Sequence, residues 1–179
     1  MTAPLLRGLA PIVGPDARML ILGNMPSALS LTARQYYGNP RNAFWRIAAE
    51  LFGCRADAPY GDRVAALCRH GVAVWDVLRA CRRAGSLDAA IERDSIVANN
   101  FDKLFAEHPG IDRVFFNGAA AEANYRRLVR PTRALTYMRL PSTSPAQTMA
   151  FADKLAAWSV VTADRQWPWP PSAPTPSHP

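Results

Sequence analysis

The residues with the most chemical potential lie in one stretch, positions 35–45, which reads Gln-Tyr-Tyr-Gly-Asn-Pro-Arg-Asn-Ala-Phe-Trp. An aromatic ring such as Tyr37 can stack on a nucleobase, and a carboxamide such as Asn42 can bond a base edge or hold a water molecule. Arg41 can meet a phosphate. Phe44 and Trp45 have a simpler interpretation as the first core residues of a helix. The composition of this stretch favours a functional role for Tyr37 and Asn42.

A second candidate loop follows an apolar run and reads Gly23-Asn24-Met25-Pro26-Ser27. Gly23 allows close approach of a ligand to the backbone, and Pro26 stiffens the loop. The loop has neither the spacing of a phosphate-binding loop nor that of Gly-x-Gly-x-x-Gly. This argues against a nucleotide triphosphatase or a dinucleotide-dependent enzyme.

Two more polar side chains stand at the ends of apolar runs. Asp76 is a carboxylate in an otherwise apolar segment, and a buried carboxylate needs a partner, so a pocket role, an arginine pair and a helix cap all stay open. Asn117 and Gly118 stand just before a predicted helix, so capping by Asn117 is an equal alternative to a pocket role.

Three consecutive hydroxyl residues, Ser142, Thr143 and Ser144, lie between two prolines and lead into a predicted helix. Hydroxyls and free amides at a helix N-terminus form an anion site that suits a DNA phosphate. A plain Ser/Thr cap is the alternative, but it needs only one hydroxyl.

These segments must be positioned by the elements around them. Apolar runs predict buried strands, and stripes of apolar residues at helical spacing predict helices between them. The strands are expected at 18–22, 72–77, 113–116 and 134–140, and the helices at 42–52, 62–68, 101–107, 119–129 and 146–158. This alternation predicts a three-layer α/β/α sandwich around a central four-stranded, mainly parallel sheet, with ligands bound at the carboxyl ends of the strands.

Length and composition set further expectations. The 179 residues with 49% apolar content predict one domain over residues 1–165, followed by a flexible, proline-rich tail over 166–179. The net charge of +7 fits a nucleic-acid partner, although an arginine-heavy composition also arises from a GC-rich genome.

The three cysteines and the apolar segments argue against several classes of protein. Cys54, Cys68 and Cys81 form no Cys-x-x-Cys pair, so no metal, iron-sulfur cluster or other cofactor is expected. Neither a leader-like N-terminus nor an apolar run of membrane-spanning length stands out. We therefore expect a soluble, cytoplasmic monomer without membrane contact.

Taken together, five segments in this order resemble the uracil-DNA glycosylase superfamily, and more narrowly its hypoxanthine-DNA (deoxyinosine) glycosylase branch. They are Gly-Asn-Met-Pro-Ser, Tyr-Tyr-Gly-Asn-Pro-Arg-Asn-Ala-Phe-Trp, Trp-Asp-Val-Leu, Phe-Phe-Asn-Gly and Leu-Pro-Ser-Thr-Ser-Pro-Ala. Met25 stands where most of the superfamily has a catalytic Asp or Asn, and Asn39 stands where His is expected. For the hypoxanthine-DNA glycosylase branch, the resemblance implies that the side chain essential for catalysis is that of Asn42.

The resemblance also implies roles for the other candidates. Residues expected to bind the base are Gly23, Met25, Tyr37, Asp76 and Asn117, and those expected to contact DNA are Pro26, Ser27, Arg41, Ser142, Thr143 and Ser144. Tyr37 would stack on an extruded base and Asn117 would bond its edge, as would Asp76. Asn42 would orient a water molecule that attacks the sugar carbon of a deaminated base.

Further expectations concern the reaction. The two lysines, Lys103 and Lys154, lie outside these segments, which predicts a monofunctional enzyme that leaves an abasic site. Three alternatives stay open: the same fold acting on uracil, a noncatalytic DNA-binding module, and an α/β hydrolase acting on a small molecule. The last lacks a Gly-x-Ser-x-Gly elbow and a suitably placed histidine.

Overall fold

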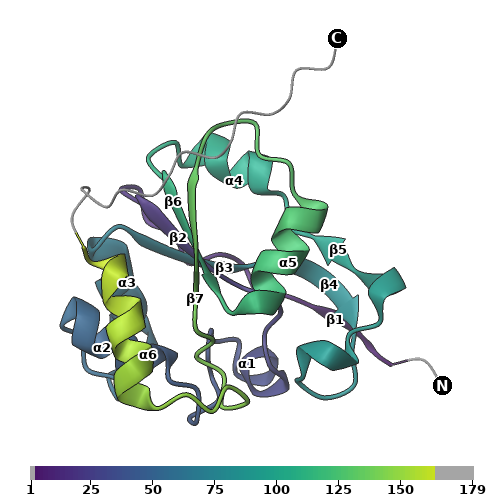
Figure 1. Ribbon diagram of the computed structural model, residues 1–179, viewed down its shortest axis with the longest axis horizontal. Coiled ribbons are helices and arrows are strands. Elements are labelled where there is room, and N and C mark those ends of the chain that lie inside the picture. The colour runs from purple at the N-terminus through teal and green to yellow at the C-terminus, as the bar shows by residue number, and fades with distance from the viewer. Residues whose placement is uncertain (1–2, 164–179) are drawn as a thin grey trace.

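A computed structural model describes residues 3–163. Its central sheet has four strands, all parallel, in the order β3-β2-β6-β7 (Figure 1). The strands are β2 (Met19–Gly23), β3 (Val72–Asp76), β6 (Arg113–Asn117) and β7 (Thr136–Leu140). The prediction of a four-stranded sheet is confirmed, with bounds that differ by one or two residues.

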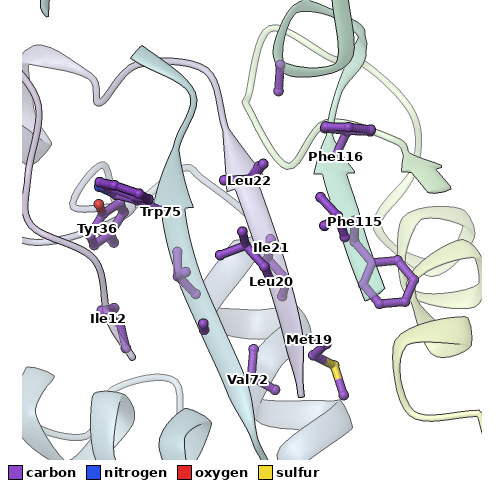
Figure 2. Packing of buried hydrophobic residues seen from close by; sticks show 14 of the residues in the cluster. Ile12, Met19, Leu20, Ile21, Leu22, Tyr36, Val72, Trp75, Phe115 and Phe116 are labelled. Atoms are coloured by element: carbon purple, nitrogen blue, oxygen red, sulfur yellow. The ribbon is translucent and has the colours of Figure 1, made fainter. Parts of the chain in front are cut away.

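The core explains why these runs form strands. Every residue of β2 and of β3 is buried. β2 is an inner strand of a sheet covered on both faces, and β3, an edge strand of the four, is bridged on its other side by Ile12, which pairs with Val74. Figure 2 shows Leu20, Ile21 and Leu22 of β2 between the side chains around Trp75 and those of Phe115 and Phe116. β7 lies at the sheet edge and is mostly half-buried or exposed.

Six α-helices flank the sheet: α1 (Ala28–Ala33), α2 (Phe44–Phe52), α3 (Tyr60–Arg69), α4 (Phe101–Glu107), α5 (Ala119–Leu128) and α6 (Phe151–Trp158). In Figure 1, α2, α3 and α6 lie on one side of the sheet, and α4 and α5 lie on the other. The predicted three-layer α/β/α sandwich is therefore confirmed.

A second, antiparallel sheet was absent from the sequence prediction. It has the order β1-β4-β5 and consists of β1 (Leu5–Arg7), β4 (Leu78–Arg82) and β5 (Val97–Ala98). The short 3₁₀ helices η1 (Asp88–Ala90) and η2 (Arg93–Ser95) lie in the connection from β4 to β5, and η3 (Ser159–Val161) follows α6. The strands of this sheet have at most five residues, and β4 carries two arginines, so the apolar pattern is too weak to reveal them.

Three helix starts differ from the prediction, and one difference matters for the site. The helix expected from residue 62 begins at Tyr60. The helix expected from residue 42 begins at Phe44, and the helix expected from residue 146 begins at Phe151. Ser142, Thr143 and Ser144 therefore do not lie at a helix N-terminus. The anion-site argument based on that helix is wrong, and any affinity of this segment for phosphate must come from its own hydroxyls and amides.

Two expectations lie wholly or partly beyond the described part of the chain. The proline-rich tail at 166–179 lies outside the described residues, so the domain boundary at 165 stays a prediction. Among residues 3–163, no helix is long and apolar enough to cross a membrane.

Candidate active site

A cavity of about 390 Å³ opens where the carboxyl ends of the strands meet the loops that follow them. All twelve residues that the sequence singled out for a site line it. They are Gly23, Met25, Pro26, Ser27, Tyr37, Arg41, Asn42, Asp76, Asn117, Ser142, Thr143 and Ser144. The strand order explains this convergence, because β2 pairs with β3 on one side and with β6 on the other, and ligand crevices in such sheets open where the order reverses.

Gly23 is the last residue of β2 and leaves the floor of the cavity open. A Cβ at this position would overlap with Oδ1 of Asp76, and it would lie 3.4 Å from the Tyr37 hydroxyl. The absence of a side chain at Gly23 is therefore what allows the carboxylate and the phenol to approach the strand end.

Tyr37 is held by its backbone conformation, by contacts of its ring and by a hydrogen bond to its hydroxyl. Its φ of 54° lies in the left-handed region, which non-glycine residues rarely adopt. The ring stacks on Phe44 with centroids 4.0 Å apart, and the hydroxyl accepts a hydrogen bond of 3.1 Å from Asn117 Nδ2. Burial and the nearby charge of Asp76 raise the pKa of this phenol, so Tyr37 is neutral.

Asn117 ties the end of β6 to the loop after β7. Its Nδ2 also donates to Thr143 Oγ1 at 2.9 Å, and its Oδ1 accepts from the Thr143 backbone N–H at 2.8 Å. The side chain makes no capping bond to α5, whose cap is Gly118, so the capping interpretation is wrong. Because both its N–H groups are engaged, Asn117 holds the cavity walls together in this structure.

Asp76 ends β3 and is the least satisfied polar group of the cavity. The side chain is 4% exposed, and its Oδ2 has no hydrogen-bond partner among the described residues. Burial and the like charge of Asp88 raise the pKa of Asp76 to about 7, and the Arg83 guanidinium opposes this rise. Neither a helix cap nor a hydrogen-bonded arginine satisfies this carboxylate, which lines the cavity.

Asn42 stands at the entry to α2 with a defined orientation. Its Oδ1 accepts a hydrogen bond of 2.9 Å from the Phe44 backbone N–H, and this partner identifies the oxygen end of the amide. Its Nδ2 makes no hydrogen bond to the described residues, and the side chain is half-buried in the cavity wall. The next residue, Ala43, donates its N–H to the carbonyl oxygen of Thr143 at 2.9 Å. The amide of Asn42 is thus aimed by α2 and by the loop after β7.

The three hydroxyl residues divide into different roles. Thr143 is buried and bonded to Asn117, whereas the Oγ atoms of Ser142 and Ser144 each accept a backbone N–H two residues further along. Lys154 supports this loop from α6, since its Nζ donates to the carbonyl oxygens of Ser144 at 3.3 Å and Gln147 at 2.8 Å.

Known proteins resemble this chain over most of its length. A family model described as the uracil DNA glycosylase superfamily matches residues 10–165. Hypoxanthine DNA glycosylases from Methanosarcina barkeri and Methanosarcina acetivorans are 31% and 33% identical to this chain, over 86% and 87% of it and 95% and 96% of their own lengths. The chain belongs to the uracil-DNA glycosylase superfamily. Its general activity is that of a DNA glycosylase, with DNA as the substrate.

A solved structure of the superfamily supports the fold as well. The solution NMR structure of a candidate uracil DNA glycosylase from Methanosarcina acetivorans has a TM-score of 0.75 and 32% sequence identity, covering 89% of this chain and 97% of that one. Met25, which stands where the resemblance implies an acid or amide in most of the superfamily, is 8% exposed and lines the cavity. Its thioether is at most a weak hydrogen-bond acceptor, so it is unsuited to orienting water.

The glycosylase cavity also contains residues that the sequence analysis missed. Asn24, Ser86, Leu87 and Asp88 line it, three of them from the connection between β4 and β5. Asn24 Nδ2 donates to Asp88 Oδ1 at 2.8 Å, across 64 positions of sequence. Gly85-Ser86-Leu87-Asp88 matches no motif, so only the folded chain reveals this contribution.

The arginines near the glycosylase site have unequal positions. Arg41 lines the cavity, whereas Arg34 lines a separate groove with the segment around β1. Arg46 lies over the Phe151 ring at 4.0 Å, and Arg139 pairs with Glu122 at 3.3 Å. Of these four arginines, Arg41 is the one that lines the cavity. Among residues 3–163, no three His, Cys, Asp or Glu side chains cluster as a metal site requires, and the expectation of a cofactor-free enzyme stays a prediction.

Proposed function

We propose that this protein hydrolyses the N-glycosidic bond of a deaminated base, hypoxanthine first of all, in DNA, and that it leaves an abasic site. The observation that carries the proposal is Asn42, whose carboxamide is oriented by the Phe44 N–H and still has Nδ2 and one oxygen lone pair for a water molecule. The names of the two curated relatives support hypoxanthine as the base.

Asn42 acts by orientation rather than by removing a proton, because an amide is a poor base. When the glycosidic bond breaks, its electron pair leaves with the base and the sugar becomes oxocarbenium-like, so a well-placed water can attack it without a strong nucleophile. The proton that the water loses ends on the departing base. The Nδ2–H groups and the free lone pair of Oδ1 can hold that water in one position. The fixed amide of Asn42 would therefore hold the water close to the sugar carbon, which is the main requirement of this step.

Asp76 is the residue proposed to read the base edge. Hypoxanthine presents N1–H as a donor and O6 as an acceptor, and a protonated carboxyl can accept from the first and donate to the second. With its pKa raised to about 7, Asp76 holds this proton over part of the neutral range. Asn117, predicted as a second reader, is proposed to keep Tyr37 and Thr143 in place instead.

The remaining cavity residues are proposed to grip the extruded nucleotide. Tyr37 provides an aromatic ring for stacking at the wall of the cavity. Arg41, Ser142 and Ser144 supply a cation and hydroxyls for flanking phosphates, and the loop from Gly23 to Ser27, which follows β2, lines the same cavity. Because a mispaired deaminated base is cheaper to extrude than a normal one, extrusion itself adds selectivity.

The lysines support the monofunctional part of the proposal. Lys154 uses its Nζ on two loop carbonyls, and Lys103 pairs with Glu107 on α4 at 3.8 Å. Neither lines the cavity. Schiff-base chemistry at the sugar would need one of these amines in the cavity.

Base release from defined oligonucleotides tests the proposal. The substrates are duplexes with a single deoxyinosine, deoxyuridine or deoxyxanthosine, and mass spectrometry identifies the released base. We expect free hypoxanthine and a strand that breaks only after heat or alkali. Release of uracil in preference to hypoxanthine would change the substrate to that named for the solved relative, and release of no base would contradict the proposal.

A further inference from the structure

A second groove adjoins the cavity and is not used by the proposed reaction. It has a volume of about 370 Å³ and lies between α5 and the connection from β4 to β5. Asn24 and Asp88 line both the groove and the cavity, so the two hollows meet at these residues. The groove is also lined by two arginines, Arg93 from η2 and Arg127 from α5. With two cations against the carboxylate of Asp88, its lining has a net positive charge.

Arg127 is held at the groove by a chain of hydrogen bonds that reaches the cavity. Its Nη2 donates to Asn124 Oδ1 at 3.0 Å, and Asn124 Nδ2 donates to Asn24 Oδ1 at 2.8 Å. Asn24 Nδ2 then donates to Asp88 Oδ1 at 2.8 Å. Both amides therefore donate toward the carboxylate and accept from the side of the guanidinium, which fixes their orientation. Arg127 uses one N–H in this chain, and the rest of its guanidinium fork stays available to a ligand.

The two neighbouring arginines at the end of α5 are engaged differently. Arg126 pairs with Glu122 at 2.9 Å. Arg130, just beyond the helix, donates to the carbonyl oxygens of Arg126 and Val129 at 2.8 and 3.0 Å. Neither Arg126 nor Arg130 lines the groove. Of these three arginines, Arg127 is therefore the one placed to bind an anion there.

Arg93 belongs to a short 3₁₀ helix whose backbone is anchored to β4. Ser95 Oγ accepts from the Arg82 N–H at 2.7 Å and donates to the Glu92 carbonyl oxygen at 2.6 Å. The Glu92 N–H donates in turn to the Arg82 carbonyl oxygen at 2.9 Å. The Arg93 side chain is exposed, and it forms no ion pair within residues 3–163. Its backbone is thus fixed while its charge is left for an external anion.

The groove and Arg41 lie on opposite sides of the central sheet. Arg41 precedes α2, which covers one face, whereas α5 covers the other (Figure 1). A nucleotide in the cavity stays joined to its strand by a phosphate on each side. Arg41 is placed for the phosphate on the side of α2, and the groove is placed for the strand on the side of α5. A cation at each end is favourable, because counterion release rewards every phosphate that is neutralised.

We propose that Arg93 and Arg127 form a phosphate clamp, in which the groove between η2 and α5 binds the backbone of the lesion-carrying DNA strand as it leaves the cavity. This inference rests on the proposed function, because it takes one nucleotide of that strand to lie in the cavity. Guanidinium groups suit this ligand, since their fork of N–H donors matches the oxygens of a phosphate. The hydrogen-bond chain through Asn124 and Asn24 keeps Arg127 in a fixed position relative to the cavity.

Binding to duplexes with a single uncharged linkage tests the clamp. The lesion strand carries a stable abasic analogue, and a methylphosphonate replaces one phosphate at a time, on either side of the analogue and along the complementary strand. We expect wild type to lose about tenfold in affinity when the clamped phosphate is made neutral, because charge-assisted hydrogen bonds are lost. The double variant Arg93→Ala with Arg127→Ala should bind the unmodified duplex more weakly by a similar factor, and it should not respond to that linkage.

The matched control is the double variant Arg79→Ala with Arg126→Ala, because both arginines are exposed and neither lines the groove or the cavity. It should keep the wild-type response at every linkage. Base release from a deoxyinosine duplex is measured in parallel, and its absence in wild type defeats the proposed function whatever the linkage pattern shows. The clamp is overturned if the Arg93 and Arg127 double variant responds to the same linkages as wild type. A wild-type response that is confined to the complementary strand, or absent at every linkage, overturns it as well.

Discussion

Replacing Asp76 by asparagine should make the protein more stable at alkaline pH than the wild type. Asparagine keeps the shape of the side chain and removes its charge. The folded state raises the pKa of Asp76 from 3.8 to about 7, mainly through burial, so the folded protein binds this proton more tightly than the unfolded chain does. By proton linkage, the contribution of Asp76 to stability falls as pH rises between these two values.

The size of the effect follows from the width of that pH range. Between pH 5 and pH 8.5 the folded protein keeps the proton over about two pH units in which the unfolded chain has already lost it. At about 1.4 kcal/mol per unit, the advantage of Asp76→Asn over wild type should grow by about 2 to 3 kcal/mol across this range. For a chain of this size, that corresponds to roughly 5–10 °C in Tm.

Thermal and urea unfolding of the two proteins at pH 5 and pH 8.5 measures this difference. The contributions of other titrating groups to the free energy of unfolding cancel, because the two proteins are compared with each other at each pH. Asp16→Asn, a change at an exposed turn residue, is the control and should show no such growth. An advantage of Asp76→Asn that is the same at both pH values would refute the reasoning, because Asp76 would then not titrate in this range.

Two further predictions concern Gly23 at the floor of the cavity and Arg41 in its wall. Gly23→Ala should lower stability by about 1–3 kcal/mol and abolish base release, because its Cβ would overlap with the Asp76 carboxylate. Gly61→Ala, where a Cβ meets nothing within 4 Å, is the control and should cause neither loss. Unfolding and activity assays of the two variants measure both effects. Arg41→Ala should reduce the salt dependence of DNA binding by about one phosphate contact, and Arg7→Ala on β1 should leave it unchanged, as titrations at several salt concentrations would show. Equal slopes for the two arginine variants would contradict the position assigned to Arg41.

The sequence predicts the central sheet and most of the cavity because both depend on local signals. Buried apolar runs mark the strands, and the rule that ligands bind at the carboxyl ends of parallel strands brings Gly23, Asp76 and Asn117 together before any coordinates are known. What Asn117 does there could not be predicted. Its bonds to Tyr37 and Thr143 join segments 80 and 26 positions away, and no local pattern encodes them.

The turn around Leu87 shows the other limit of sequence reasoning. The strands that flank it are short and mixed in polarity, and the turn is placed by contacts to Ala28 and Asn24, which are distant in sequence. A leucine next to Ser86 and Asp88 has no helical or alternating period that would mark it. Its position beside the cavity is a property of the fold.

The central claim is that Asn42 orients the attacking water, and single-turnover release of hypoxanthine by Asn42→Ala tests it most directly. Asn100→Ala is the matched control, because Asn100 Oδ1 likewise accepts a backbone N–H, that of Lys103 at 3.0 Å, at the start of α4 and outside the cavity. Each variant should lose about 1 kcal/mol of stability from the lost side-chain to backbone hydrogen bond. We predict that Asn42→Ala lowers the rate at least about 100-fold while Asn100→Ala stays within about twofold of the wild type. A rate for Asn42→Ala that matches that of Asn100→Ala would contradict the account.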